Sequence, residues 1–348
     1  MTSPSLKVLA VNPLDYADEL KELFLAEDHP NFPKVFDRAY VSAAQSGGKS
    51  WIGTDAEGRL VLHIARFPRR FTLGERAVAG GVLLDLIAAK SHRTVVPALT
   101  LMRRLAADSK GEQDVDFVYA TPSAVGSAVL RAAGFSIVDT LRRFVFPLAD
   151  ERWYAHAATR VYQTMLRVRA WSTAATAVEH PAERFDAGAF ERPPGATPAL
   201  RPLRPAELYR QCLAGYPSSA DHWFTFHRGS RITQPSAAVL VRGGGDRVAT
   251  LLSLSREPSL PVSAIIPGLA AALRRTGYRR LWVYTLTGTQ FARELTRAGF
   301  VARPDHLPML TYAVTELGAE ALRSVATWEV TGLDCDPYLH VSSDRPAA

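Results

Sequence analysis

One acidic side chain interrupts an otherwise apolar stretch of this sequence. Residues 81–89 read Gly-Val-Leu-Leu-Asp-Leu-Ile-Ala-Ala, so Asp85 is the only charged group in a segment typical of a mostly buried strand. A carboxylate there must be ion-paired, be solvated from a cleft, or have its pKa raised by burial. Asp85 is therefore a candidate general base. The structural alternative is a salt bridge to one of the arginines of residues 66–70 on the preceding hairpin.

A basic turn without glycine follows this strand and leads into a helix. Residues 90–99 read Lys-Ser-His-Arg-Thr-Val-Val-Pro-Ala-Leu, and no glycine occurs between Gly81 and Gly111. Where a strand turns into a helix, backbone N–H groups and the helix dipole can hold a phosphate group, usually with glycine in the turn. This turn is a phosphate cradle built without glycine, a cradle that has decayed, or an ordinary strand-to-helix connection.

Strands and helices alternate around these residues and must position them. Hydrophobic periodicity and turn residues predict strands at 7–10, 50–53, 60–67, 77–89, 117–120 and 137–147, and helices at 15–26, 31–44, 95–109 and 123–133. Pro97 fits only the first turn of its helix, where no backbone bond needs its missing N–H. A further amphipathic helix is expected at 150–171, followed by a Pro- and Ala-rich segment, 178–205, with the composition of a linker.

The second half of the chain repeats part of the first. Val118-Tyr119 is followed by Gly134-Phe135, and Val283-Tyr284 by Gly299-Phe300, with 15 positions from tyrosine to glycine in both cases. Equal spacing, with a similar helix between the two pairs, favours a tandem duplication offset by 165 residues. The sequence predicts a mixed α/β fold in which residues 1–148 form the first domain, 149–198 connect, and 199–348 form a second, degenerate copy with a C-terminal tail.

Composition limits the class of protein. The 348 residues are 47% apolar and 22% charged, and no apolar run approaches the roughly 20 residues that span a bilayer. No signal peptide is visible, so a cytoplasmic protein is expected. Cys212 and Cys335 have no metal-ligand spacing, and no metal is expected. The net charge of +7 favours anionic partners, but basic blocks interleaved with aromatics are missing, which makes nucleic acid an unlikely partner.

The order of elements and the turn around Arg93 resemble the GNAT superfamily of acyl-CoA N-acyltransferases. In that family the turn after the fourth strand carries an R/Q-x-x-G-x-G/A signature; Arg93 and Ala98 match its ends, whereas Val96 replaces its first glycine. The likeness is closer to tandem proteins linked to surface polysaccharide or amino-sugar pathways. Their motifs resemble H-R-x-x-x-P-A-L at residues 92–99, Y-x-x-P-S at 119–123 and W-x-x-T-x-x-D-x-D at 328–336.

The resemblance implies acetyl-CoA or another acyl-CoA as cofactor and a small-molecule amine as acceptor. It implies that the thioester lies along the fourth strand and the phosphates at the turn, which gives as cofactor-binding residues Leu86, Ile87, Ala88, Arg93, Thr94, Val95, Val96, Ala98 and Leu99. It also places Asp85 as the base and Tyr119 or Ser123 beside the departing thiolate. The alternatives are a core role for Tyr119, which recurs as Tyr284, and an N-cap for Ser123.

Two further sets of acidic and histidine residues fit an acceptor site in that family. Asp28 and His29 lie between the first two helices, with Asp221-His222-Trp223 as a counterpart loop in the second half. The alternative is that both loops are simply caps. Asp334 and Asp336 would anchor a cationic amine, unless they form a solvated tail. The second copy has no equivalent of the Arg93 turn between Leu251 and Leu273, so it is not expected to bind CoA.

Two other functions remain open from the sequence. One is an aminoacyl-tRNA-dependent transferase of the peptidoglycan-bridge type, which is also a tandem GNAT fold and would need tRNA as partner. Salt-dependent tRNA binding would favour it. The other is a non-catalytic binding protein on a GNAT fold, which the missing glycines favour. The sequence does not fix the oligomeric state.

Overall fold

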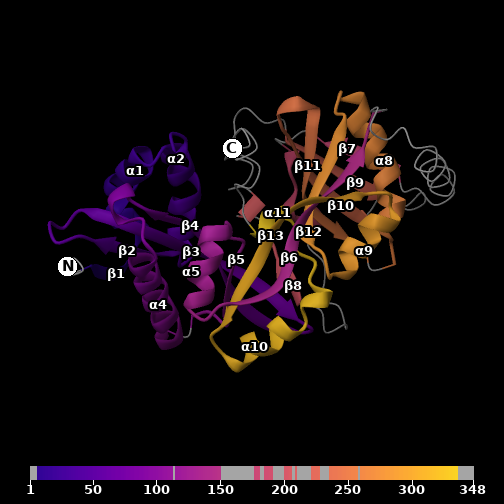
Figure 1. Ribbon diagram of the computed structural model, residues 1–348. Helices are drawn as coiled ribbons and strands as arrows, with labels where there is room; N and C mark the ends of the chain where they lie inside the picture. The colour runs from indigo at the N-terminus through magenta and orange to yellow at the C-terminus, as the bar shows by residue number, and fades with distance from the viewer. Residues whose placement is uncertain are drawn as a thin grey trace. The chain divides into compact units, whose positions relative to one another are not determined.

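The computed structural model describes residues 6–112, 114–149, 176–180, 184–190, 200–205, 208–209, 221–227, 235–257 and 259–335. The chain forms two compact units (Figure 1). Unit 1 comprises residues 1–139, 198–203 and 307–325, and unit 2 comprises residues 140–197, 204–306 and 326–348. Within the described residues, no helix is both long enough and apolar enough to cross a membrane.

Unit 1 contains a mixed sheet. Its strands are, in spatial order, β1 (Lys7–Val11), β2 (Lys49–Thr54), β3 (Leu60–Leu73), β4 (Arg76–Ala88), β5 (Phe117–Ala120) and the part of β13 (Val301–Ala313) from residue 307 on, with β8 (Leu200–Leu203) paired to β3. Neighbours are antiparallel except β4 and β5, which are parallel. The helical segments are η1 (Pro13–Tyr16), α1 (Ala17–Ala26), α2 (Phe32–Val35), η2 (Phe36–Tyr40), α3 (Val41–Gln45), η3 (Lys90–His92), α4 (Val95–Glu112), α5 (Ala124–Ala132) and α10 (Glu316–Arg323).

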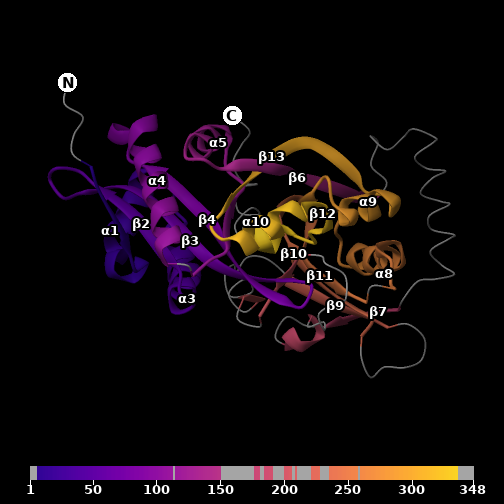
Figure 2. The same cartoon turned by 90° about the horizontal axis from the view of Figure 1, so that it is seen from below.

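Alternate residues of β3 point to opposite faces of this sheet, and each face has its own layer of helices (Figures 1 and 2). His63 and Phe67 contact the aromatic side chains of the α1–α3 region, namely Phe24 and Tyr40. Leu62 and Ile64 instead belong to a core that includes Leu101 and Leu105 of α4. Asp85 of β4 contacts Tyr40 on the α1–α3 face.

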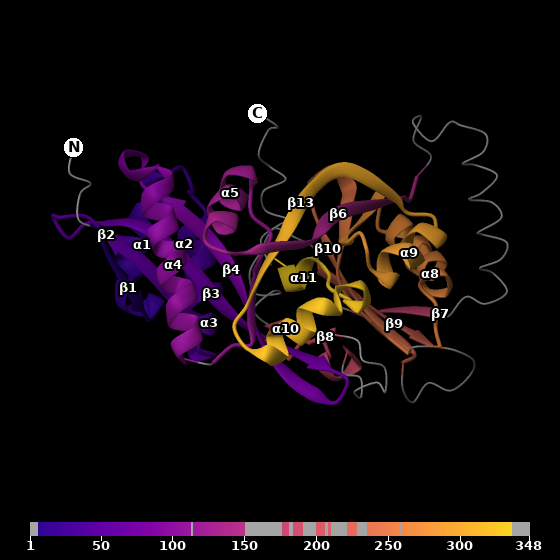
Figure 3. The same cartoon turned by 60° about the horizontal axis from the view of Figure 1, so that its bottom comes forward.

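Unit 2 also contains parallel and antiparallel sheet strands. Its strands are, in spatial order, the part of β6 (Ser136–Pro147) from residue 140 on, β12 (Arg280–Leu286), β11 (Val248–Arg256), β10 (Ala237–Gly243), β9 (Asp221–His227) and β7 (Thr176–His180). Only β11 and β12 are parallel. The helical segments are η6 (Ala187–Phe190), η7 (Gly245–Arg247), α8 (Val262–Arg275), α9 (Gln290–Arg297), η8 (Val325–Thr327) and α11 (Gly332–Cys335). Helices α8 and α9 pack side by side on one face (Figure 3).

The mixed α/β fold and the duplication are confirmed. A strand, a helix, a glycine and a strand follow one another as β5–α5–Gly134–β6 and again as β12–α9–Gly299–β13. Both glycines have positive φ, 97° and 94°, which explains why glycine recurs at this place. The last strand of each repeat pairs with a strand of the other repeat, because β6 pairs with β12 and β13 pairs with β5. This exchange was not part of the prediction.

Three segments differ from the sequence-based expectation. Residues 176–180 and 200–203 have a linker-like composition, yet they form β7, paired with β9, and β8, paired with β3. The backbone pairing of an edge strand does not require an apolar sequence. Asp221-His222-Trp223 was expected in a loop but belongs to β9. The helix expected at 150–171 lies outside the described residues.

Candidate functional site

Strand β4 carries an extra residue where Asp85 stands. Ala65 of β3 pairs with Leu84, and His63 pairs with Ile87, so one residue of β3 lies opposite Asp85 and Leu86 of β4. Asp85 has a left-handed backbone with φ 58°. Aspartate tolerates this region better than most residues, but the conformation still costs energy, on the order of 1 kcal/mol. Bulges and left-handed residues concentrate at functional sites.

A second irregular turn brings Tyr40 to this carboxyl group. Residues 32–45 form a continuous helical segment whose central turn, η2, is a π-helix. Tyr40, the last residue of that turn, is fully buried, and its hydroxyl donates a hydrogen bond of 2.6 Å to Oδ2 of Asp85. A π turn places one more residue in the helix than an α turn would and is frequent at functional sites. Two unusual backbone segments therefore meet in one hydrogen bond.

Burial is the main influence on Asp85. It raises the pKa of this carboxyl to about 6, against the opposing effect of the hydrogen bond from Tyr40. The side-chain hydrogen bond that holds this group comes from Tyr40, and Arg66, one of the three arginines of the salt-bridge alternative, is instead paired with Asp114 and donates to Ser109 of α4. Asp85 is a carboxyl whose proton exchanges near neutral pH, which is what a general base requires.

Strand β5 stays beside β4 only up to the residues that precede this bulge. The parallel register runs from Gly80–Phe117 to Val82–Tyr119, and β4 then continues for six residues to Ala88. Leu86, Ile87 and Ala88, the residues predicted to lie along a thioester cofactor, belong to this extension and follow Asp85 directly.

The turn after β4 has an ion pair that the sequence did not suggest. Arg93 makes a salt bridge to Glu27, and its Nε donates to the carbonyl of Ala88 at 3.1 Å. Glu27 is buried and also accepts the backbone N–H of Lys90 at 2.9 Å. In this structure Arg93 therefore ties the end of β4 to the end of α1, whereas its predicted partner is a phosphate.

Helix α4 begins two residues after Arg93. Thr94 precedes it, Val95 and Val96 are its first residues and are 59% and 63% exposed, and Ala98 and Leu99 follow Pro97 in its first turn. The first amides of a helix have no partner within the helix. The two valine side chains point to solvent. The first amides of the 18-residue helix α4 therefore lie at the place where a phosphate is expected.

Tyr119 and Ser123 have the surroundings expected for structural roles, which are a core aromatic for Tyr119 and an N-cap for Ser123. The ring of Tyr119 is fully buried and lies near Phe71 and Phe117, with centroid distances of 6.0 and 5.8 Å. Ser123 is the N-cap of α5, where its hydroxyl oxygen accepts the N–H of Gly126 at 3.4 Å. The catalytic assignments of both residues stay predictions.

Asp28 and His29 lie between α1 and α2, as expected. Asp28 has φ 65° and is 3.4 Å from the ammonium of Lys90. The ring of His29 meets that of Phe24 edge-on at 5.6 Å. Both residues thus lie on the α1–α3 side of unit 1, on which Tyr40 contacts Asp85.

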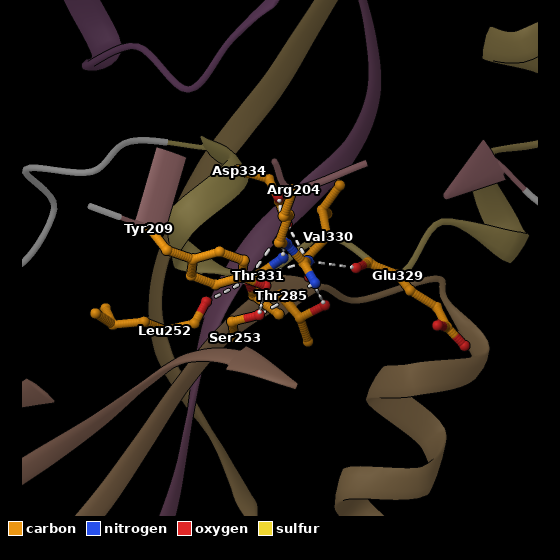
Figure 4. A network of polar contacts seen from close by, with 9 residues as sticks. All are labelled: Arg204, Tyr209, Leu252, Ser253, Thr285, Glu329, Val330, Thr331 and Asp334. Atoms are coloured by element: carbon orange, nitrogen blue, oxygen red, sulfur yellow. Dashed lines mark hydrogen bonds and ion pairs between the residues drawn. The ribbon is translucent and has the colours of Figure 1, made fainter. Parts of the chain in front are cut away.

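Asp334 is buried within unit 2, and Asp336 lies outside the described residues. Arg204 donates from Nε to Oδ1 of Asp334 at 2.8 Å, and both side chains are at least nine-tenths buried (Figure 4). The hydroxyl of Thr331 donates to the carbonyl of Leu252 on β11, and the hydroxyl of Thr285 on β12 donates to the carbonyl of Val330 (Figure 4). The W-x-x-T-x-x-D segment thus lies between β11 and β12, and Asp334 has a structural partner.

Among the described residues, no group of three or more His, Cys, Asp or Glu side chains is arranged to hold a metal ion. Scans against protein-family models and curated proteins gave no match.

Solved structures do resemble the chain. A protein of Enterococcus faecalis V583 described as a probable N-acyltransferase has a TM-score of 0.63 at 10% identity, over 90% of this chain and 74% of that one. The fold is that of the GCN5-related N-acetyltransferases. Such an enzyme from Kribbella flavida gives a TM-score of 0.61 at 13% identity, over 90% of this chain and 73% of that one. Eis1 from Mycobacterium abscessus gives 0.58 at 12% identity, over 91% and 76%.

Sequence reasoning missed three residues of the candidate site in unit 1. Tyr40 and Glu27 are the partners of Asp85 and Arg93, and His63 contacts the backbone carbonyl of Asp85. An aspartate within a strand was itself a signal, because aspartate is enriched in the left-handed region that a bulge can need. Nothing in the helix around Tyr40 marks a π turn.

Proposed function

We propose that this chain is an N-acyltransferase that moves an acyl group from acyl-CoA to the amine of a small acceptor, with Asp85 of unit 1 as general base. The observation that carries the proposal is Asp85 itself: a left-handed residue in a bulge of β4, just past the point where β5 leaves that strand, with its pKa raised to about 6. The GNAT fold and neighbours named as N-acetyltransferases support the reaction class.

The residues of unit 1 fit an acyl-CoA. The extension of β4 from Leu83 to Ala88 offers backbone groups on the side where β5 has ended, and the N-terminus of α4 offers amides to the phosphates. Pro97 contributes no N–H, so the amides of Val95 and Val96 are the ones assigned to this role. When bound, the cofactor supplies an acyl group activated as a thioester.

Asp85 prepares the acceptor for attack. An aliphatic amine is mostly protonated at neutral pH and has no free electron pair in that form. Above pH 6 the Asp85 carboxylate can take this proton, while Tyr40 holds Oδ2 and leaves Oδ1 for the amine. The neutral amine then forms the new C–N bond as the C–S bond breaks, and the proton that the nitrogen loses on becoming an amide goes to the departing sulfur.

The acceptor is assigned by chemistry and by resemblance. Asp28 and His29 lie on the Tyr40 side of unit 1 and are proposed as acceptor contacts. An amino sugar or nucleotide sugar is proposed because the H-R-x-x-x-P-A-L and W-x-x-T-x-x-D motifs resemble those of tandem proteins in such pathways.

The test combines calorimetry with an acyl-transfer assay. Titration with acetyl-CoA and with a longer acyl-CoA is expected to give one binding event per chain, and free thiol is expected to appear with a panel of amines that includes glucosamine. If neither acyl-CoA binds, the proposal is wrong. Asp85→Asn keeps the shape and the left-handed tolerance of the residue, so it is expected to bind the cofactor and lose turnover.

A second candidate is a GNAT-fold binding protein that transfers no acyl group. The salt bridge of Arg93 to Glu27 favours it, because the charge of Arg93 is paired with a carboxylate and is not directed at a phosphate. Acyl-CoA binding without thiol release for any amine in the panel would support this candidate.

A further inference from the structure

A buried chain of hydrogen bonds lies beneath the bulge of β4 and crosses three strands of unit 1. Oγ of Ser50 on β2 is 3.0 Å from Nε2 of His63 on β3, and Nδ1 of His63 is 3.1 Å from the backbone carbonyl oxygen of Asp85 on β4. Ser50 and His63 are both fully buried. The N-acyltransferase mechanism above uses neither side chain.

The direction of every bond in this chain is determined. A carbonyl oxygen only accepts, so Nδ1 of His63 must carry the proton. Burial lowers the pKa of His63 to about 4, against the hydrogen bond to Asp85, so the ring is neutral at neutral pH. Nε2 then has a free electron pair, and the Ser50 hydroxyl donates to it. One tautomer of His63 satisfies both partners.

The carbonyl that His63 holds belongs to the residue with the unusual backbone. An extra residue in a bulge is left out of the regular strand ladder, so its carbonyl needs another donor. His63 supplies this donor from the neighbouring strand. A peptide fixed on its carbonyl side restricts the Asp85 backbone, and the backbone in turn fixes where the carboxyl points, which is toward Tyr40.

We propose that Ser50 and His63 are positioning residues, which lock the left-handed bulge at Asp85 and thereby the orientation of its carboxylate. Ser50 fixes the tautomer of His63, His63 fixes the Asp85 carbonyl, and Tyr40, whose ring lies beside that of His63, fixes the carboxyl. The catalytic consequence rests on the proposed function, whereas the structural consequence does not.

The matched substitutions are His63→Asn and His63→Gln. Asparagine carries its amide nitrogen at the δ position, where the donor to Asp85 is needed, and glutamine carries it at the ε position, facing Ser50. A residue that only fills space would tolerate glutamine better, because glutamine is closer to histidine in volume. The proposal expects the reverse order.

The measurement is an NMR titration of the carboxyl carbon of Asp85 in the full chain, assigned with Asp85→Asn. The wild type and His63→Asn are expected to titrate near pH 6. In His63→Gln the titration is expected to move toward that of an ordinary aspartate, near pH 4. Ser50→Ala is expected to shift it in the same direction by a smaller amount.

Kinetics supply an independent measurement. His63→Gln is expected to lower kcat about tenfold, to leave KM for acyl-CoA unchanged, and to move the acid limb of the pH profile with the NMR titration. His63→Asn is expected to recover most of kcat. The proposal is overturned if His63→Gln retains as much kcat as His63→Asn or more. It is also overturned if both variants fold and neither moves the Asp85 titration.

The two proposals fail in different ways. If the protein has no acyl-transfer activity but the Asp85 titration follows the asparagine–glutamine order, the proposed function is wrong and the positioning role stands. If Asp85→Asn abolishes turnover while both His63 variants behave like the wild type, the proposed function stands and the positioning role is wrong.

Discussion

The two units differ at the place where a pair of parallel strands stops pairing. In unit 1 the parallel strands β4 and β5 last pair at Val82 and Tyr119, and in unit 2 β11 and β12 last pair at Leu251 and Val283. Both β4 and β11 have a register shift close to this point, at Asp85–Leu86 and at Leu252. Pairing between the two parallel strands therefore stops early in both copies of the repeat, close to a register shift.

What lies at the parting distinguishes the copies. In unit 2 the chain supplies its own hydrogen bonds, since residues 330–331 join the Leu252 carbonyl on β11 to Thr285 on β12, and Arg204–Asp334 fastens the segment (Figure 4). In unit 1 the parting is followed by a strained acidic residue. Buried backbone groups must be paired with something. We infer that the chain itself does this in unit 2, and that the acyl-CoA does it in unit 1.

The strongest test of this difference is Asp85→Asn. The variant is expected to lose turnover by about 10²–10⁴-fold, the usual contribution of a general base, with acyl-CoA binding retained. Stability at pH 8 is expected to stay the same or to rise, because a partly buried charge has been removed. Steady-state thiol release and denaturant unfolding measure the two effects. Comparable turnover in the variant would remove Asp85 from the mechanism.

The second test weakens the attachment of residues 330–334, which bind β11 and β12 in unit 2. Although burial lowers the pKa of Arg204, the Asp334 carboxylate raises it overall, so the arginine stays charged. Asp334→Asn leaves that buried charge without its partner and is expected to lower the free energy of unfolding by about 3–5 kcal/mol.

The double variant Arg204→Met with Asp334→Leu is the matched control for this ion pair. It removes both charges and is expected to be less destabilised than Asp334→Asn, as measured by urea unfolding. In both proteins the number of acyl-CoA molecules bound is expected to remain one per chain. A single substitution that unfolds no more easily than the wild type would contradict the fastening role of the pair.

The third test uses the opposite titrations of Asp85 and His63. The pKa of Asp85 is raised from 3.8 to about 6, so its stabilising contribution is full below pH 3.8 and is lost as pH rises through 6. The pKa of His63 is lowered from 6.5 to about 4, so its contribution is present above pH 6.5 and is lost as pH falls through 4. Each effect amounts to about 3 kcal/mol, and the two nearly offset one another between pH 7 and pH 4.

Removing one member should expose the other. Between pH 7 and pH 4, Asp85→Asn is expected to lose about 3 kcal/mol more stability than the wild type, because only the His63 effect remains. His63→Asn is expected to change in the opposite direction. Urea midpoints followed by circular dichroism at several pH values give both differences. Parallel curves for all three proteins would show that these groups do not have the shifted pKa values.

Much of the fold followed from local sequence patterns. Alternation and turn residues located β4 and β5, and the equal Tyr-to-Gly spacing located both copies of the strand–helix–strand unit. The exchange of β6 and β13 did not follow, because a strand's sequence sets its faces but not which neighbour it pairs with. Strand β7 was missed because residues 176–180 have a linker-like composition, and the backbone pairing of an edge strand does not require an apolar sequence.

The surroundings of the candidate site could be predicted only in part. Asp85 was singled out because a charge in an apolar strand requires an explanation. Its partner Tyr40 was not found, because contact between them depends on a π turn and a bulge, and neither has a sequence signature strong enough to read from one chain. Arg93 was assigned to phosphate from its place in a motif, while Glu27, which lies 66 residues earlier, is its partner in the structure.

The smallest expected effect concerns Arg93 and separates its two roles. Arg93→Ala leaves the buried Glu27 carboxylate without its ion pair and is expected to lower stability by about 1–2 kcal/mol. If Arg93 also contacts the cofactor, the dissociation constant for acyl-CoA rises about tenfold, which corresponds to about 1.4 kcal/mol. The control is the double variant with Glu27→Gln, which removes the unpaired charge. Recovery of stability with binding still weak would assign Arg93 to the phosphates. Recovery of both would make the turn a structural connection, leaving the amides of Val95 and Val96 to hold the phosphates of acyl-CoA.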